Sequence, residues 1–181
     1  MDQGFRVLKI AQQGQLNIPV KIINNSVSAR DLTLIQGDLA WRRTRPSLWQ
    51  DNHTLWAQEL REGFSGRVMI TPTHTAVTGM LRHTVNRYHP VLSLDRVVCQ
   101  YCVWGEDSGI NPHNDQRYRW AATLYLNDDW CDSFGGLFLA GGMAITPEQG
   151  LLVINEAHET HCVSRIKPNV PPRVTVQIWA W

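Results

Sequence analysis

The chain has 181 residues, of which 43% are hydrophobic and 18% are charged, and its formal net charge is +1. This length and composition predict one globular domain over residues 1–181, and the weak net charge gives no reason to expect nucleic acid or a membrane surface as a partner. No apolar run could span a bilayer and the first residues lack the features of a signal peptide, so we expect a cytoplasmic protein.

The first ninety residues are predicted to form strands and helices that support the rest of the chain. We expect two short strands and two helices, at residues 5–10, 18–23, 48–60 and 75–88. The last of these has the clearest pattern, because its apolar residues recur every three or four positions from Val77 to Tyr88. Asn24-Asn25 reads as a turn. These helices are predicted to pack on one sheet, with residues 1–94 supporting a functional core at 95–181.

Residues 42–45, Arg-Arg-Thr-Arg, form the densest basic cluster. They could bind an anionic substrate, but a solvated loop is the simpler interpretation of a short charge run.

The Cys99-Gln-Tyr-Cys102 segment has the spacing of half a zinc site, with no second such pair in the chain. Residues 96–104 read as a strand, in which positions three apart point to opposite faces. We therefore interpret the cysteines as ordinary buried thiols.

His113-Asn114-Asp115 is the first candidate for metal binding. Side chains two apart in an extended segment point to the same side, so His113 and Asp115 could hold one ion from a strand end. Two imidazoles and one carboxylate suit ferrous iron and leave positions open for a co-substrate and dioxygen. The pair alone is a weak signal, since a turn histidine beside a turn aspartate is common.

Residues 120–126 alternate between two faces. Trp120, Ala122, Leu124 and Leu126 form an apolar face, which leaves two small residues and Tyr125 on the other. Small residues beside a phenol predict a cavity with one polar tip, although a tyrosine packed in the core fits the pattern equally well.

The C-terminal residues 173–181 also alternate with period two, as a half-buried strand does. One face is aliphatic, whereas the other carries Arg173, Thr175, Gln177, Trp179 and Trp181. An arginine with a hydroxyl two residues away can donate several hydrogen bonds to a carboxylate. An edge strand with its polar face in water is the alternative.

A second histidine ligand is needed to complete an iron site. His161 is favoured because it begins an extended run before the Arg173 strand, after a predicted buried strand at 150–155. His158 competes with it, but falls in the polar turn of residues 156–160.

Taken together, residues 97–181 resemble the iron(II)- and 2-oxoglutarate-dependent oxygenases, and within them the prolyl hydroxylase type related to the oxygen-sensing enzymes. The matching segments are His113-Asn-Asp115, Ala122 through Trp130, Gly135-Gly-Leu137, His161 and Arg173 through Trp179.

The resemblance implies roles for individual residues. His113, Asp115 and His161 would bind iron and form the catalytic centre. Arg173 and Tyr125, with Thr175, would bind the distal carboxylate of 2-oxoglutarate. Trp179 would wall the substrate side, and either Tyr101 or Trp104 would line the co-substrate pocket, because the family's usual tyrosine and glycine-rich loop are not matched here.

The implied fold is mainly β with supporting helices: a double-stranded β-helix, a jelly-roll barrel of the cupin kind. The implied cofactors are Fe(2+), 2-oxoglutarate and O2, with ascorbate as a candidate stimulant. Asp115 is the carboxylate that halogenating relatives lack, so hydroxylation is expected. The substrate would be a small molecule or a peptide: a free amino acid, a natural-product intermediate or a prolyl residue. A non-catalytic jelly-roll metal-binding or sensing module is the alternative function.

Overall fold

The computed structural model describes residues 20–89 and 96–181. The strand predicted at residues 5–10 lies outside the described residues. Of the strand predicted at 18–23, the structure describes β1 (Val20–Ile23), and a turn follows at Asn24-Asn25 as expected.

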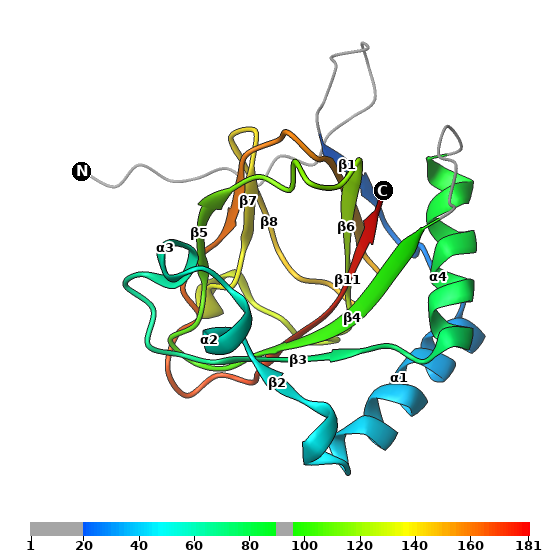
Figure 1. The fold of residues 1–181 in the computed structure, drawn as a ribbon, viewed down its shortest axis with the longest axis horizontal. Coiled ribbons are helices and arrows are strands. Elements are labelled where there is room, and N and C mark those ends of the chain that lie inside the picture. The colour runs from blue at the N-terminus through cyan, green and yellow to red at the C-terminus, as the bar shows by residue number, and fades with distance from the viewer. Residues whose placement is uncertain (1–19, 90–95) are drawn as a thin grey trace.

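Within the described residues the strands form two antiparallel sheets that face each other across the interior (Figure 1). The large sheet contains, in spatial order, β1, β9 (Leu152–Glu156), β6 (Trp120–Tyr125), β11 (Arg173–Ala180), β4 (Val97–Trp104), β3 (Val68–Pro72) and β2 (Gln50–Asp51). The small sheet contains β5 (Ile110–His113), β10 (His161–Val163), β7 (Phe138–Ala140) and β8 (Met143–Ile145). This mainly β, jelly-roll arrangement is the predicted double-stranded β-helix.

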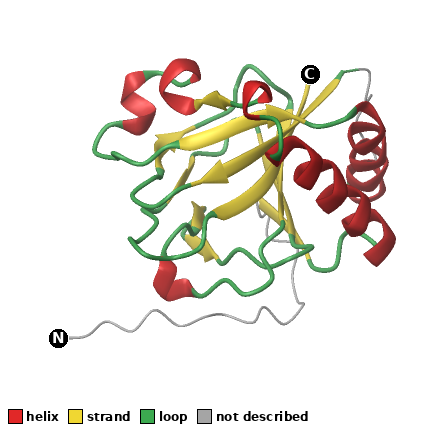
Figure 2. Ribbon diagram, turned by 90° about the horizontal axis from the view of Figure 1, so that it is seen from below, coloured by secondary structure: helices red, strands yellow, loops and turns green. Residues whose placement is uncertain are grey.

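Two long helices, α1 (Ala29–Arg43) and α4 (Thr75–Tyr88), cover the outer face of the large sheet (Figure 2). The bounds of α4 are those predicted, and its apolar stripe packs on the sheet through Val77, Leu81 and Val85. The helix α1 was not predicted. Its buried hydrophobic side chains are only Ile35 and Leu39, too few to give a clear amphipathic pattern.

The helix predicted at residues 48–60 is wrong. The segment consists of short pieces, because Asp51 caps a new helix through the His53 amide and Trp56 adopts an extended backbone that ends it. The pieces are η1 (Pro46–Leu48), β2, α2 (Asn52–Leu55) and α3 (Gln58–Arg61); a further short helix is η2 (Asp132–Phe134). The breaks allow Trp56 and Leu60 to face the interior between the sheets.

The basic cluster is not a solvated loop, because it ends α1. Arg42 is buried and forms an ion pair with Asp38 at 3.1 Å, while the Arg45 guanidinium lies 3.8 Å from the centre of the Trp41 ring. Its first member is therefore a structural residue, and the other three residues of the cluster are exposed.

Cys99 and Cys102 are buried on opposite faces of β4, as expected, and are free thiols. Burial raises the pKa of each to about 12. No helix among residues 20–89 and 96–181 is long and apolar enough to cross a membrane.

The two faces of the central strands divide as the alternation predicted. Trp120, Ala122, Leu124 and Leu126 pack in the core beneath the helices, together with the aliphatic face of β11. The opposite faces of β6 and β11 meet in register, with Tyr125 beside Thr175 and Thr123 beside Gln177. All of these inward residues therefore lie on the wall that faces the small sheet.

Candidate active site

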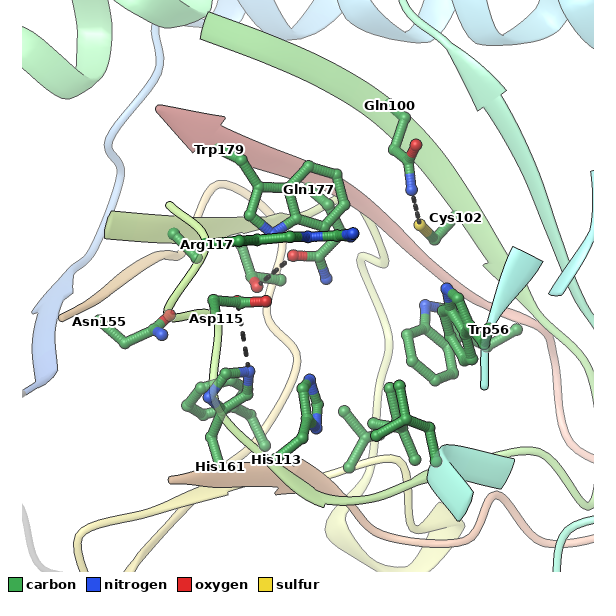
Figure 3. Close-up of a pocket in the computed structure, with 17 residues that line it drawn as sticks. Trp56, Gln100, Cys102, His113, Asp115, Arg117, Asn155, His161, Gln177 and Trp179 are labelled. Carbon is green, nitrogen blue, oxygen red and sulfur yellow. Dashed lines mark hydrogen bonds and ion pairs between the residues drawn. The ribbon is translucent and has the colours of Figure 1, made fainter. Parts of the chain in front are cut away.

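The two histidines come together because their strands pair. His113 ends β5, His161 begins β10, and the two residues are direct partners in the antiparallel ladder. Their ring centres lie 4.4 Å apart. Asp115 follows β5, and its Oδ2 lies 3.7 Å from His161 Nε2 (Figure 3). His158 is exposed in the turn before β10 and does not line the pocket that contains this group.

Each histidine is held through its Nδ1 atom by a backbone carbonyl. His113 Nδ1 is 2.8 Å from the Asn111 oxygen, and His161 Nδ1 is 3.0 Å from the Glu159 oxygen. Since a carbonyl only accepts, Nδ1 donates the hydrogen bond, which leaves Nε2 as the ring nitrogen that could bind a metal, the orientation typical of metal-binding histidines. Burial, assisted by the neighbouring His161, lowers the pKa of His113 and so favours the neutral ring.

The donor set fits a divalent transition metal. One ion could contact both His161 Nε2 and Asp115 Oδ2 across their 3.7 Å separation, because metal–nitrogen and metal–oxygen bonds are about 2.1 Å long. In the described parts of the chain no three His, Cys, Asp or Glu side chains are already gathered at metal-binding distances. His113 is the third donor beside this pair, with its ring centre 4.4 Å from that of His161.

Arg173 is a buried cation with no counter-charge in the part of the chain that the structure describes. It has no exposed surface, and none of its three guanidinium nitrogens has a hydrogen-bond partner among the described residues. The Tyr125 hydroxyl is also buried without a partner. Burial lowers the pKa of Arg173 and raises that of Tyr125. A buried charge is stable only when it is compensated, so this pair fits the carboxylate of a bound anion such as 2-oxoglutarate.

Aromatic rings and one small residue hold Arg173 in place. Its guanidinium carbon lies 4.9 Å from the centre of the Trp104 ring and 5.1 Å from that of Tyr125. Thr175 is buried two residues further along β11 and accepts a hydrogen bond from Trp104 Nε1 at 3.3 Å. Gly136 has φ +66°, and a Cβ there would lie 3.0 Å from the Arg173 Cδ, so a glycine lets the loop pack on the arginine stem.

Beside these groups is a cavity of about 110 Å³. One wall is apolar and includes Trp56, Leu60, Ile110 and Phe138, and the tilted Trp56 and Trp104 rings have centres 5.4 Å apart. The other wall is polar and includes Gln100, Arg117, Asn155 and Gln177. A mainly apolar lining with a few polar groups is typical of a small-ligand site.

The choice between Tyr101 and Trp104 is decided by the faces of β4. Tyr101 is a correction to the predicted site, because its hydroxyl bonds the Ile35 carbonyl at 3.0 Å and Asp38 at 3.1 Å, beneath α1. Trp104, three residues along, points to the other face and lines the pocket. Trp179 also lines the pocket, whereas Trp181 is 40% exposed.

Sequence reasoning did not single out Arg117 or Asn155. Both line the pocket beside Asp115 (Figure 3). Asn155 is buried at a position predicted only to be part of a strand. Arg117 lies two residues after Asp115, and this spacing was its only signal in the sequence.

Residues 97–181 match the sequence profile of the 2OG-Fe(II) oxygenase superfamily. These residues belong to that superfamily. The matched segment contains both histidines, the aspartate, Tyr125 and Arg173, and the chain is accordingly a 2-oxoglutarate-dependent dioxygenase. Membership of this superfamily implies Fe(2+), 2-oxoglutarate and O2 as its cofactor and co-substrates.

Solved structures share the fold of this 2OG-Fe(II) oxygenase. A Pseudomonas putida prolyl-4-hydroxylase is 19% identical, with a TM-score of 0.67 over 89% of this chain and 91% of that one. A Trichoplax adhaerens prolyl hydroxylase, in complex with a hypoxia inducible factor peptide fragment, is 16% identical, with a TM-score of 0.68 over 91% and 84%.

HygX from Streptomyces hygroscopicus, solved with nickel, 2-oxoglutarate and hygromycin B, is 12% identical, with a TM-score of 0.62 over 89% of this chain and 82% of that one. A search of curated proteins found no match.

Proposed function

We propose that this dioxygenase hydroxylates an unactivated C–H bond of an amino acid, either free, within a natural-product intermediate or as a residue such as proline in a peptide. The reaction would consume one 2-oxoglutarate and one O2. One oxygen atom enters the substrate as the hydroxyl and the other enters succinate, while the 2-oxoglutarate carboxyl next to the ketone leaves as CO2.

The observation that carries this proposal is the presence of two complementary features in one barrel. A histidine, histidine and aspartate donor set lies on the small-sheet side, and the buried, uncompensated Arg173 lies on the facing sheet. A ligand that chelates a metal at one end and presents a carboxylate at the other satisfies both. 2-Oxoglutarate has this structure.

In this proposal His113, Asp115 and His161 hold the iron, which together with 2-oxoglutarate supplies the oxidising chemistry when bound. Arg173 donates paired hydrogen bonds to the distal carboxylate, and the Tyr125 hydroxyl donates another. Thr175 already receives the Trp104 indole N–H, so its own hydroxyl proton is free to point toward the same group. These contacts fix the co-substrate in one orientation.

The remaining walls would position the substrate carbon. Trp56, Leu60 and Phe138 exclude water from one side of the pocket, and Trp179 borders the other. Because the position of the substrate carbon relative to the metal decides which bond reacts, these side chains would set the regiochemistry.

Relatives of the same fold support both a peptide and a small-molecule substrate. The Trichoplax adhaerens enzyme was solved with a peptide fragment, and HygX was solved with hygromycin B. The pocket, with its apolar and amide-lined walls, is compatible with an amino-acid side chain or ring.

The test is succinate formation by the purified protein supplied with iron(II), ascorbate and 2-oxoglutarate, first alone and then with amino acids and proline-containing peptides. Asp115→Ala and His161→Ala should each abolish succinate formation, because each removes a metal ligand. His158→Ala is the matched control and should leave most of it. A protein that binds iron but forms no succinate under any of these conditions would instead be a non-catalytic metal-binding module.

A further inference from the structure

Arg117 is a cation in the substrate pocket that the co-substrate does not use. It follows Asp115 by two residues, in a turn closed by the Tyr118 amide, which donates to the Asp115 carbonyl at 2.8 Å. Its side chain extends into the pocket between Trp179 and Asp115 (Figure 3). It is also solvent-exposed, so it lies at the open side of the pocket.

The turn is anchored although Arg117 is exposed. The Tyr118 ring stacks on Trp179, with centres 5.7 Å apart, and meets Trp181 edge-on at 4.9 Å. The Arg119 amide donates to the Ala180 carbonyl at 2.8 Å. These contacts tie the two residues after Arg117 to the end of β11, so its backbone has a fixed position at the pocket.

Arg117 has no ion pair among residues 20–89 and 96–181. Asp115, the acidic residue nearest in sequence, is oriented toward His161 Nε2 at 3.7 Å. When Asp115 binds the metal, its charge is used there. The guanidinium therefore remains available to an anion from outside the chain.

Arg173 and Arg117 lie toward different ends of the barrel. Arg173 and Trp179 are six residues apart on β11, which separates their backbones by about 20 Å, since a strand rises about 3.3 Å per residue. Arg173 is fully buried behind Trp104 and Tyr125, while Arg117 lies beside Trp179. Arg173 thus suits the buried carboxylate of the co-substrate, and Arg117 faces the space left for the substrate.

A hydrogen-bond donor accompanies Arg117. The Gln177 side-chain oxygen accepts from the Thr123 hydroxyl at 2.9 Å, which leaves the Gln177 amide N–H groups as its contribution to the pocket. The guanidinium also carries only donors. A group with several acceptor atoms and a negative charge complements the two together.

We propose that Arg117 binds a free carboxylate of the substrate, so that the enzyme acts on an amino acid with a free α-carboxylate, either free in solution or at the C-terminus of a peptide. This inference rests on the proposed function, because it names the substrate class of the same site. An internal residue of a peptide has no such carboxylate and would leave Arg117 without a partner.

The first experiment compares matched acids and amides. Succinate formation above the substrate-free rate is measured with the common L-amino acids, including L-proline, and with their carboxamides. Glycyl dipeptides with free and amidated C-termini form a parallel set. We expect stimulation by acids and at least tenfold less by the corresponding amides. Stimulation by free amino acids, or only by the dipeptide acids, would identify which source supplies the carboxylate.

The second experiment changes Arg117. Arg117→Gln should raise the KM for the carboxylate substrate about 10- to 100-fold, as expected for a lost charge-assisted hydrogen bond, with a smaller change in kcat. Arg117→Lys should restore part of the loss because it keeps the charge. Arg119→Gln is the matched control, since this exposed arginine does not line the pocket.

Three outcomes overturn the inference. Amides or internal prolyl peptides could stimulate as well as acids, Arg117→Gln could leave the KM unchanged, or no acid in either set could stimulate. Substrate-free conversion of 2-oxoglutarate to succinate separates this failure from failure of the proposed function. If that conversion occurs, the oxygenase function stands and only the role of Arg117 is lost.

Discussion

Replacing Arg173 with methionine should make the ligand-free protein more stable while removing its response to 2-oxoglutarate. The guanidinium is fully buried and has no accepting partner among the described residues. Desolvation of such a charge costs several kcal/mol, whereas each of the two flanking rings returns only about 0.5–2 kcal/mol. Methionine keeps an unbranched stem of similar reach without the charge.

The magnitude follows from these two contributions. Replacement of a buried ion pair by apolar side chains is neutral or stabilising by about 1–4 kcal/mol, and an unpaired charge lacks the attraction that offsets its desolvation. A protein of this size gains about 2–4 °C in Tm for each kcal/mol, so Arg173→Met should melt about 2–16 °C above the wild type. At a 2-oxoglutarate concentration about 100 times its Kd, the wild type should gain about 2.7 kcal/mol and the variant nothing.

The assay is thermal unfolding followed by circular dichroism, with and without 2-oxoglutarate, with manganese(II) in place of iron to prevent turnover. Arg82→Met on α4 is the matched control, because Arg82 is exposed. It should leave both the Tm and the response to 2-oxoglutarate near those of the wild type. A ligand-free Arg173→Met variant that melts below the wild type, or one that gains as much from 2-oxoglutarate, would refute the reasoning.

Three further predictions concern the metal, the thiols and the core. His161→Ala should lower the affinity for manganese(II) at least tenfold, measured by calorimetry, while His158→Ala should change it less than twofold; equal losses would contradict the ligand assignment. Iodoacetamide at pH 7 should label Cys131 first, because it is exposed and the Ser133 hydrogen bond lowers its thiol pKa, whereas burial raises the Cys99 pKa to about 12 and should protect that thiol until the protein unfolds. Peptide mapping distinguishes the two sites, and early labelling of Cys99 would count against the packing of β4. Tyr101→Phe removes a buried hydroxyl that is hydrogen-bonded to the helix α1, so it should lower the free energy of unfolding by about 1–3 kcal/mol. The Kd for 2-oxoglutarate should not change. Weaker binding of 2-oxoglutarate by this variant would indicate that Tyr101 lines the co-substrate pocket after all.

The alternation of side chains along a single strand could be predicted from the sequence alone. The polar face of residues 173–179 and the small-residue face of 121–125 both line the interior, because successive side chains of a strand point to opposite sides whatever packs on them. The helix at Thr75–Tyr88 has the predicted bounds for a similar reason, since its apolar stripe is long and regular.

The two errors in predicting helices concern segments whose local sequence signals were weak or conflicting. The helix α1 buries few apolar residues, and the signal for it was Ser28, which caps the Asp31 amide at 3.1 Å. The apolar spacing of residues 48–60 resembled one helix, but Trp56 adopts an extended backbone there and packs near Trp104 in the pocket. In this short segment tertiary contacts override the helix that the spacing of apolar residues predicted.

The sequence by itself determined which side chains share a strand face, because that depends only on the geometry of the local backbone. For residues 97–104 it could not determine which face meets the helices and which meets the cavity. That choice separated Tyr101, beneath α1, from Trp104, beside Arg173. Only the pairing of β5 with β10 brought His113 against His161, and only the turn after Asp115 directed Arg117 into the pocket. Contacts between residues far apart in the chain depend on how the strands pair and how the two sheets face each other, and the local spacing of residues does not predict that arrangement.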